Sequence, residues 1–174
     1  MMMKKFFRVT PSNLGTPLYL ISSNSRFFNS DTDLLPYIRG ENTYTHPLEM
    51  SIKGKKKVDI LPCCGYLALT VRVVDLLRRH QFTGWDSFPI KIDKPERVSG
   101  SVVGLVVKGR LGPSSKDYWS DISNWDGSDF AVHQYGFGVT VTERVIAAFE
   151  AEKITGAEWE PVNVIQGEAG DKEN

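Results

Sequence analysis

The stretches LTVRVVDLLRRHQFTGWDSFPIKI (residues 69–92) and VTERVIAAFEAEKITGAEWEPVNV (residues 141–164) repeat one pattern. Apolar residues recur at matching places in both, and several residues are identical when the stretches are aligned without a gap. The identical pairs are Thr70/Thr142, Arg72/Arg144, Val73/Val145, Thr83/Thr155, Gly84/Gly156 and Pro89/Pro161. We therefore predict the same local structure in both stretches.

Each stretch predicts a helix, a turn and a strand. Val73, Leu76 and Leu77 have the i, i+3, i+4 spacing of one apolar helix stripe. Thr70 and Thr142 stand where N-cap residues are expected, because a threonine hydroxyl can accept a hydrogen bond from the first turn. The Thr-Gly pair after each helix suits a chain reversal, and the proline that follows favours an edge strand or a strand's first residue. A chance match between two ordinary amphipathic helices is the alternative interpretation.

Short apolar runs elsewhere predict the strands around these two units. Residues 101–107 (SVVGLVV) are almost continuously apolar, which is typical of a strand covered on both faces. Further strands are predicted at residues 6–9, 18–21, 50–52 and 58–61. We expect the last two to form a hairpin that turns near Gly54.

These elements predict an α+β fold with a mixed or antiparallel sheet and two pseudo-repeated helix–turn–strand units. A chain of 174 residues has the length of one domain and can bury its own core. We expect that single domain to span residues 1–166, with its motif-bearing part at residues 58–164. Residues 167–174 (GEAGDKEN) contain little to bury, so we expect a disordered tail there.

The charges balance, with 21 lysines and arginines against 21 aspartates and glutamates. This argues against general nucleic-acid binding, which needs a basic footprint, and we predict no nucleic-acid partner. The charges are nevertheless unevenly spread, because four lysines cluster at residues 53–57 and the last third of the chain is acidic. Such clusters are ordinarily solvated faces or turns.

The sequence predicts a cytoplasmic protein that does not span a membrane. Its two cysteines, Cys63 and Cys64, are adjacent and cannot build a disulfide framework, which favours a reducing compartment. No apolar run approaches the roughly 18 residues of a membrane span. The start MMMKKFFRV has too short an apolar run for a signal peptide.

The sequence contains no pattern typical of a catalytic or metal site, so we predict a protein that is not an enzyme and has no metal or cofactor. His46, His80 and His133 have no metal-ligand spacing, and the adjacent cysteines lack the CxxC spacing of a zinc site. His80 falls near the predicted end of the first helix, where a capping or surface histidine is the simpler interpretation. Neither a phosphate-binding loop nor a nucleophile elbow is present.

Tryptophans and acids gather in the segment before the second repeated stretch. Its candidate residues are Trp119, Asp121, Trp125, Asp126 and Asp129. Acids in such a group could bind a metal or act in acid–base chemistry. The same pattern is also typical of a turn that holds a tryptophan against the core, and both interpretations stay open.

Several short motifs together resemble a known family. From about residue 58 to residue 164, the chain resembles immunity-protein family eleven of bacterial polymorphic-toxin systems. Some relatives have a CxxCG motif where this chain reads PCCG, so any metal role there does not transfer. The motifs that carry the resemblance are TGW at 83–85, FP at 88–89, GRLGP at 109–113, WDGSDF at 125–130, the glycine bend at 136–138, VTERV at 141–145, and Thr155-Gly156.

The resemblance implies a protein that binds a cognate toxin domain and blocks the toxin's active site or its folding. Only a complementary surface is needed for this, and an acidic face with tryptophans suits it, since aromatic anchors dominate interface energetics and charge speeds encounter with a basic toxin. We therefore predict that the five acids and tryptophans named above bind the partner. The alternatives are a small-ligand-binding protein or enzyme, and a scaffold subunit that forms a stable homodimer.

Overall fold

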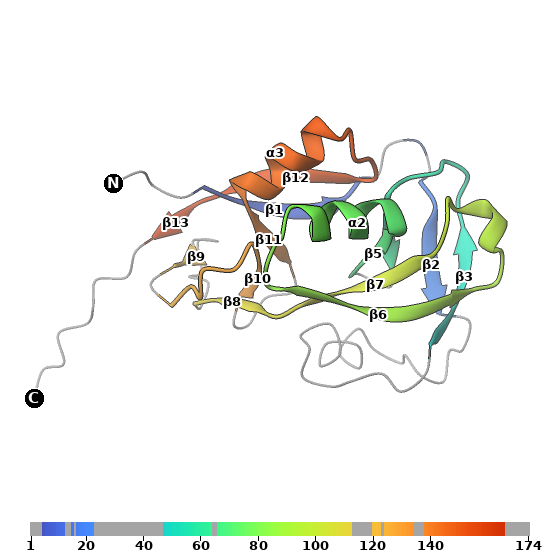
Figure 1. Cartoon of the computed structure of the whole chain (residues 1–174), viewed down its shortest axis with the longest axis horizontal. Coiled ribbons are helices and arrows are strands. Elements are labelled where there is room, and N and C mark those ends of the chain that lie inside the picture. Colours follow the sequence, from blue (N-terminus) through green and yellow to red (C-terminus); the bar gives the residue numbers. More distant parts are fainter. Residues whose placement is uncertain are drawn as a thin grey trace, which may run out of the picture.

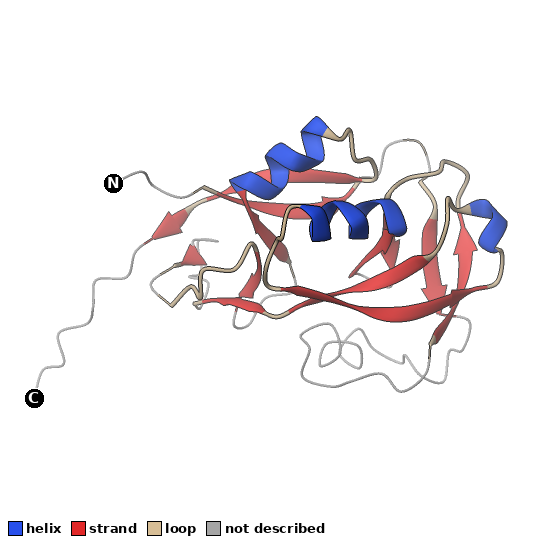
Figure 2. Cartoon of the chain, viewed as in Figure 1, coloured by secondary structure: helices blue, strands red, loops and turns tan. Residues whose placement is uncertain are grey.

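A closed barrel and an open sheet share one hydrophobic core in this protein (Figure 1). Strands dominate the architecture, and the two longer helices lie over the region where the two parts meet (Figure 2). The fold is thus α+β, as predicted, with strands both parallel and antiparallel to their neighbours. The computed structural model describes residues 5–12, 15, 17–22, 47–63, 66–112, 120–122, 124–133 and 138–165.

The barrel closes through strands that are far apart in the sequence. Its interior is filled by aliphatic side chains such as Leu20, Ile52 and Leu61, each at most 1% exposed. The 3-10 helix η1, Pro95–Arg97, leads from β6 towards β7. In barrel order the strands are β2 (Tyr19–Ser22), β3 (Leu48–Lys53), β6 (Trp85–Ile92), β7 (Val102–Val107), β5 (Tyr66–Thr70) and β4 (Ile60–Cys63).

The open sheet has five strands and two differently covered faces. One face contributes Val9, Phe130 and Val141 to the core shared with the barrel, and the other contributes Phe6 and Ala131 to a smaller cluster. Two short strands, β9 (Ser120–Asp121) and β13 (Val164–Ile165), pair in parallel beside it. In sheet order the strands are β12 (Ala157–Val162), β1 (Phe6–Pro11), β11 (Val139–Thr142), β10 (Phe130–His133) and β8 (Gly109–Leu111).

Both predicted helices are present, as α2 (Val71–Arg79) and α3 (Glu143–Ala151). A nine-residue helix is too short to be stable by propensity alone, so each depends on the burial of its apolar stripe. The predicted stripes do face the shared core, where each fully buried aliphatic side chain contributes about 1.5–3 kcal/mol. The buried helical residues are Val73, Val74, Leu76 and Leu77 in α2, and Val145, Ile146, Ala148 and Phe149 in α3.

The strands around the two helices pair in the same way. β7 pairs antiparallel with β5 and β6, which flank α2 in the chain. β1 pairs antiparallel with β11 and β12, which flank α3. Thr70 is opposite Val102 in the first arrangement, and Thr142 is opposite Phe6 in the second. The first helical unit is therefore completed by the next strand of the chain, and the second by a strand from the other end of the sequence.

Thr70 and Thr142 occupy the N-cap positions as predicted, but neither side chain makes a capping hydrogen bond. Distant backbone carbonyls instead bind the first N–H group of each helix, because Val71 N–H donates to Ser101 O and Glu143 N–H donates to Lys5 O. Ser101 and Lys5 directly precede β7 and β1, so the strand that completes each unit also caps its helix. The prediction of side-chain caps was therefore wrong.

The predicted hairpin between residues 50–52 and 58–61 is also wrong, because β2 lies between β3 and β4 in the barrel. Gly54 does turn the chain with a φ of +89°. After it, however, Leu18 N–H donates to Lys56 O, and the chain runs past β2 before β4 begins. The residues from 101 to 107 do contain the predicted strand, β7, and most of its side chains are buried.

The two prolines of the repeated stretches lie in different settings. Pro161 is in β12, an edge strand of the open sheet, as predicted. Pro89 is an exposed residue of β6, a barrel strand with a neighbour on each side and therefore not an edge strand. β6 pairs with β7 up to Pro89 and with β3 from Ile90 onwards, so the proline stands where one pairing gives way to the other. The predicted tail at residues 167–174 lies outside the described residues.

Two carboxylates on the barrel predict how the fold responds to acid. The hydrogen bond from Lys108 lowers the pKa of Asp86 below the ordinary 3.8, and the hydrogen bond from Ile52 N–H lowers the pKa of Asp93. A folded-state pKa below the unfolded value stabilises the fold above about pH 3.8, and this stabilisation is lost as the pH falls through the folded-state pKa.

We expect the melting temperature of Asp93→Asn to be below that of the wild type at pH 7. The two melting temperatures should converge once the pH falls below the folded-state pKa of Asp93, and a constant difference across a pH series would contradict this cause.

Candidate functional site

Asp129 is a buried carboxylate that connects the two helical units. It lies just before β10 and is 6% exposed. Its Oδ2 accepts hydrogen bonds from Thr83 N (2.9 Å) and Thr83 Oγ1 (3.2 Å). Its Oδ1 accepts from Thr142 Oγ1 (2.9 Å) and pairs with Arg144 Nε at 2.8 Å. Asp129 therefore joins the turn after α2 to the first turn of α3.

Asp59 makes a similar set of contacts in the other unit. Its Oδ2 accepts from Thr155 N (3.0 Å), Thr155 Oγ1 (2.9 Å) and Arg72 Nη1 (3.0 Å). It lies just before β4, so it joins the turn after α3 to the first turn of α2. Each acid is therefore bonded to the threonine that follows the other unit's helix.

The two acid clusters differ at the N-cap threonine. Thr142 Oγ1 donates to Asp129, but Thr70 Oγ1 is buried without a hydrogen-bond partner among the described residues. They also differ in their surroundings, because Asp129 and Thr142 line a pocket. The Asp129 cluster is therefore the one we consider as a functional site.

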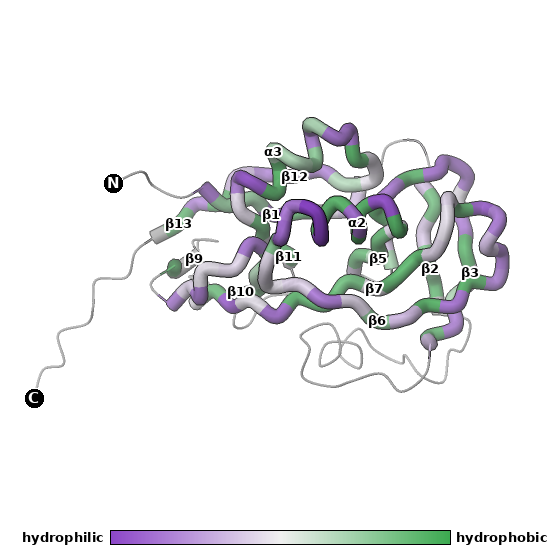
Figure 3. Tube along the Cα trace, viewed as in Figure 1, coloured by the Kyte–Doolittle hydropathy of each residue, from purple (hydrophilic) through white to green (hydrophobic). Residues whose placement is uncertain are grey.

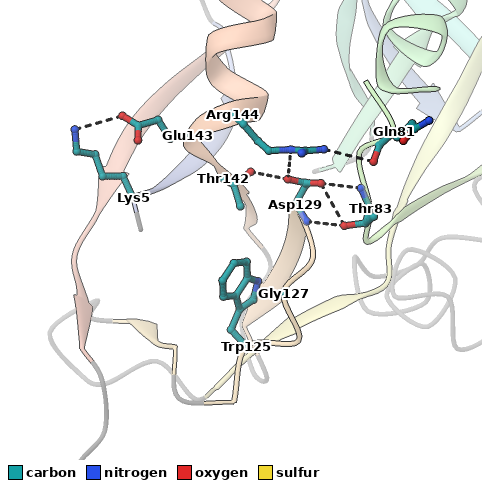
Figure 4. Close-up of a pocket in the computed structure, with 9 residues that line it drawn as sticks. All are labelled: Lys5, Gln81, Thr83, Trp125, Gly127, Asp129, Thr142, Glu143 and Arg144. Carbon is teal, nitrogen blue, oxygen red and sulfur yellow. Dashed lines mark hydrogen bonds and ion pairs between the residues drawn. The ribbon is translucent and has the colours of Figure 1, made fainter. Parts of the chain in front are cut away.

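The Trp125 pocket has a volume of about 490 Å³ and opens beside the first turn of α3 (Figure 4). Lys5 and Glu143 form an ion pair at 3.3 Å on one side of it, with side chains 68% and 58% exposed. Arg144 extends across the opening and also lies over the Phe82 ring, 4.8 Å from its centroid. The lining residues are Lys5, Gln81, Thr83, Trp125, Gly127, Asp129, Thr142, Glu143 and Arg144.

Trp125 is held in place on the wall of this pocket. Its Nε1–H donates to Ser128 O at 3.0 Å, and its ring meets Phe6 edge to face with centroids 5.0 Å apart. Asp126 Oδ1 accepts from Ser128 N at 3.0 Å, which closes the turn, and Gly127 takes a φ of +87°. The loop thus presents a fixed, partly buried indole to the pocket.

The structure brings part of the predicted partner-binding set together. Trp125 and Asp129 both line the pocket, and Asp126 is exposed in the same loop. Asp129 is not the surface acid that we expected, because both its oxygens are bonded within the protein. Trp119 lies outside the described residues, and Asp121 is in β9 opposite Ile165 with its side chain outside them.

Seven of the nine pocket residues were not in the predicted set, namely Lys5, Gln81, Thr83, Gly127, Thr142, Glu143 and Arg144. The repeat offered one signal, because an arginine and a threonine recur at matching places although neither belongs to an apolar stripe. Identical polar residues in two amphipathic helices indicate a shared role. Lys5 carried no such signal, since β1 reaches the site only through its pairing with β11.

The structure describes some of the histidines and cysteines considered as metal ligands. His80 ends α2 as its exposed C-cap residue, and its ring stacks on Phe82 at 5.3 Å. Cys63 is buried, whereas Cys64 and His46 lie outside the described residues. Across the ranges that the structure describes, no three histidine, cysteine or acidic side chains are placed to hold a metal ion.

Comparison with known proteins adds no assignment. No protein-family model matches the chain, and no curated protein matches it significantly. The resemblance to an immunity-protein family therefore stays an expectation. Among the described helices, none has the length and apolarity needed to cross a membrane.

Proposed function

We propose that this protein is an immunity-type binding protein that neutralises a cognate toxin by covering it with the surface around the Trp125 pocket. The observation that carries the proposal is the fixed indole at the pocket wall, with exposed acids on both sides of it. Asp126 is in the tryptophan's own loop, and Glu143 begins α3 on the other side of the pocket. This is the arrangement of an aromatic anchor with a charged rim.

The rigidity of the loop supports this role. An anchor residue that is already held before binding loses little conformational entropy when the partner arrives. Trp125 is held by Phe6 on its edge and by Ser128 O at its Nε1. The Lys5–Glu143 pair, in contrast, is exposed and is worth about 0–1 kcal/mol, so a basic partner residue can replace Lys5 at Glu143 at small cost.

Co-expression with the product of the neighbouring large open reading frame is the experiment that tests the proposal. We expect growth rescue and a complex that co-purifies. Glu143→Lys should weaken that complex at least about tenfold, because it places a like charge against a basic partner. Glu150→Lys is the matched control, since Glu150 is exposed on the same helix but does not line the pocket.

The results of co-expression and of the two lysine variants show whether the toxin binds around the Trp125 pocket. A toxin that kills regardless, with no complex, would overturn the proposed function. Equal loss in both lysine variants would place the interface elsewhere. Thermal melting of each variant is the check on folding, because an acid in the first turn of a helix contributes about 0.3–1 kcal/mol through the helix dipole.

A small-ligand binder is the second candidate, and the size of the pocket favours it. A volume of about 490 Å³ falls in the range of ligand pockets, roughly 300–1,000 Å³, and cationic and polar groups converge there. A thermal-shift screen tests this candidate, since a ligand at about 100 times its Kd stabilises the folded state by about 2.7 kcal/mol. A hit that loses its effect in Arg144→Gln would favour this function over toxin binding.

We also infer that the chain is an internal pseudo-repeat in which the acid of each unit is bonded to the turn of the other. The matching contacts of Asp59 and Asp129, and the matching pairings of β1 and β7, support this inference. Backbone hydrogen bonds agree, because Ser12 N–H donates to Gly156 O and Lys108 N–H donates to Gly84 O. On this view, the Trp125 pocket is a feature added to one of two similar clusters.

A further inference from the structure

The last residue of β3 and the loop between β3 and β4 present a cluster of lysines at the far end of the barrel. Lys53, Lys55, Lys56 and Lys57 are all exposed. Figure 1 shows β2 and β3 at one end of the long axis and β9 and β13 at the other, so this loop is remote from the Trp125 pocket. The tube there is strongly hydrophilic in Figure 3.

The loop is fixed by hydrogen bonds to its backbone. Arg97 donates to the carbonyl oxygens of Ile52 (3.2 Å) and Gly54. Leu18 N–H donates to Lys56 O at 2.8 Å, and Pro17 bridges to Lys56. The lysine ammonium groups therefore project from an anchored segment.

These lysines differ from others on the surface in how their charge is balanced. Lys5, Lys91 and Lys108 are each within ion-pair distance of an acid. Among the described residues, no ion pair involves the lysines at positions 53, 55, 56 and 57. Asp93 lies close enough for Lys94 and Lys53 to help lower its pKa, but its main stabiliser is the hydrogen bond from Ile52 N–H. The loop therefore carries a local excess of positive charge in a chain of zero net charge.

Exposed apolar side chains adjoin the lysines. Tyr19 and Ile21 on β2 are 37% and 40% exposed, which is unusual for large apolar residues of this protein. Tyr19 is directly opposite Lys53 in the β2–β3 pairing, and Ile21 is opposite Ser51. The surface therefore combines a cationic loop with two neighbouring apolar side chains on one sheet.

We propose that this lysine loop, together with Tyr19 and Ile21, is a second interaction surface that binds an acidic polypeptide segment with apolar residues between its acids. Glutamates and aspartates would pair with the lysines, and the apolar residues would cover Tyr19 and Ile21. The barrel is closed, so the segment would be held by side chains and not by addition of a strand.

The chemistry of the surface favours carboxylates over a nucleic-acid backbone. Bidentate arginines are the strongest phosphate binders, and the guanidinium of Arg97 is instead bonded to two backbone carbonyls. The positive region is also confined to one loop, whereas binding along a nucleic acid needs a basic footprint that follows the strand. An acidic segment with apolar residues matches both halves of the surface.

Fluorescence anisotropy with a short labelled peptide, in which glutamates alternate with leucines, tests this proposal. We expect binding that weakens with salt. The triple variant Lys55→Gln/Lys56→Gln/Lys57→Gln should weaken binding about tenfold, and Tyr19→Ala about fivefold. The matched control is Lys5→Gln/Lys91→Gln/Lys108→Gln, which removes the same charge from lysines that are already paired.

The control should bind the peptide within about twofold of the wild type. Equal weakening in both triple variants would show a general charge effect and overturn the proposal. An oligonucleotide of the same charge that binds more tightly than the peptide would also overturn it, in favour of a nucleic-acid surface. Because the assay contains no toxin, its result is independent of the immunity-type function.

Discussion

Asp129→Asn is expected to lower the free energy of unfolding by about 3 kcal/mol, although it removes no atom from the core. Each carboxylate oxygen faces an N–H group that can only donate, with Thr83 N–H at Oδ2 and Arg144 Nε–H at Oδ1. Whichever way the new amide turns, its NH₂ group therefore meets another donor. Arg144 is 56% exposed, so most of the cost comes from the buried contacts with Thr83 and Thr142. Thermal unfolding should show a melting temperature lower by about 6–12 °C.

Asp59→Asn is the matched control, because the same change meets a different geometry. The three hydrogen bonds from Thr155 and Arg72 all reach Oδ2. An asparagine can keep its carbonyl oxygen at that position and turn its amide nitrogen to the other side. We expect Asp59→Asn to lower the free energy of unfolding by about 1 kcal/mol. Asp75→Asn, on the exposed face of α2, should change it by no more than about 0.5 kcal/mol. If Asp59→Asn and Asp129→Asn lowered the free energy of unfolding equally, the clash between the new NH₂ group and a second donor at Asp129 would not be the cause.

The local features of the fold could be predicted from the sequence because they depend on local spacing. The apolar stripe around Val73 and Leu76 identified α2, and its repetition identified α3. The continuous apolar run at residues 101–107 likewise identified β7. In each case the apolar residues of a short segment predict which side chains are buried, and no knowledge of distant partners is needed.

Features that depend on distant partners could not be predicted. The N-cap positions were predicted correctly, but the expected side-chain caps are absent. Backbone carbonyls of Ser101 and Lys5 bind the helix starts, and the sequence near Thr70 and Thr142 does not indicate them. The hairpin prediction failed because β2 inserts between β3 and β4. Strand order in a closed barrel is set by packing of the whole chain, which a short window does not contain.

The candidate site could be predicted only in part, because its composition is local but its partners come from distant parts of the chain. The tryptophan and acids of the 125–129 loop stand out by composition, and Trp125 does line the pocket. Composition could not distinguish the exposed Asp126 from the buried Asp129. The partners that decide the difference, Thr83 and Arg144, come from two other elements of the chain.

Gly156→Ala is expected to be at least as damaging as the change at Asp129, with a loss of about 3–5 kcal/mol. Gly156 has a φ of +96°, which costs an alanine about 1–2 kcal/mol. A Cβ there would also lie 2.1 Å from Ile60 O and 2.7 Å from Val58 Cβ. The turn would have to move away from β4, and its hydrogen bonds to Asp59 would weaken as it moved. Chemical denaturation should give a lower midpoint with an unchanged slope.

Gly127→Ala separates the two causes, because Gly127 has a φ of +87° but an added Cβ would meet no atom of another part of the chain within 4 Å. It should lose only the conformational part, about 1–2 kcal/mol. Gly84→Ala should behave like Gly156→Ala, since its Cβ would lie 2.2 Å from Phe130 O. If all three variants lost the same amount, backbone conformation alone would explain the glycines. A larger loss at Gly84 and Gly156 than at Gly127 would instead show that the close approach of each turn to the other unit's strand holds the two units together.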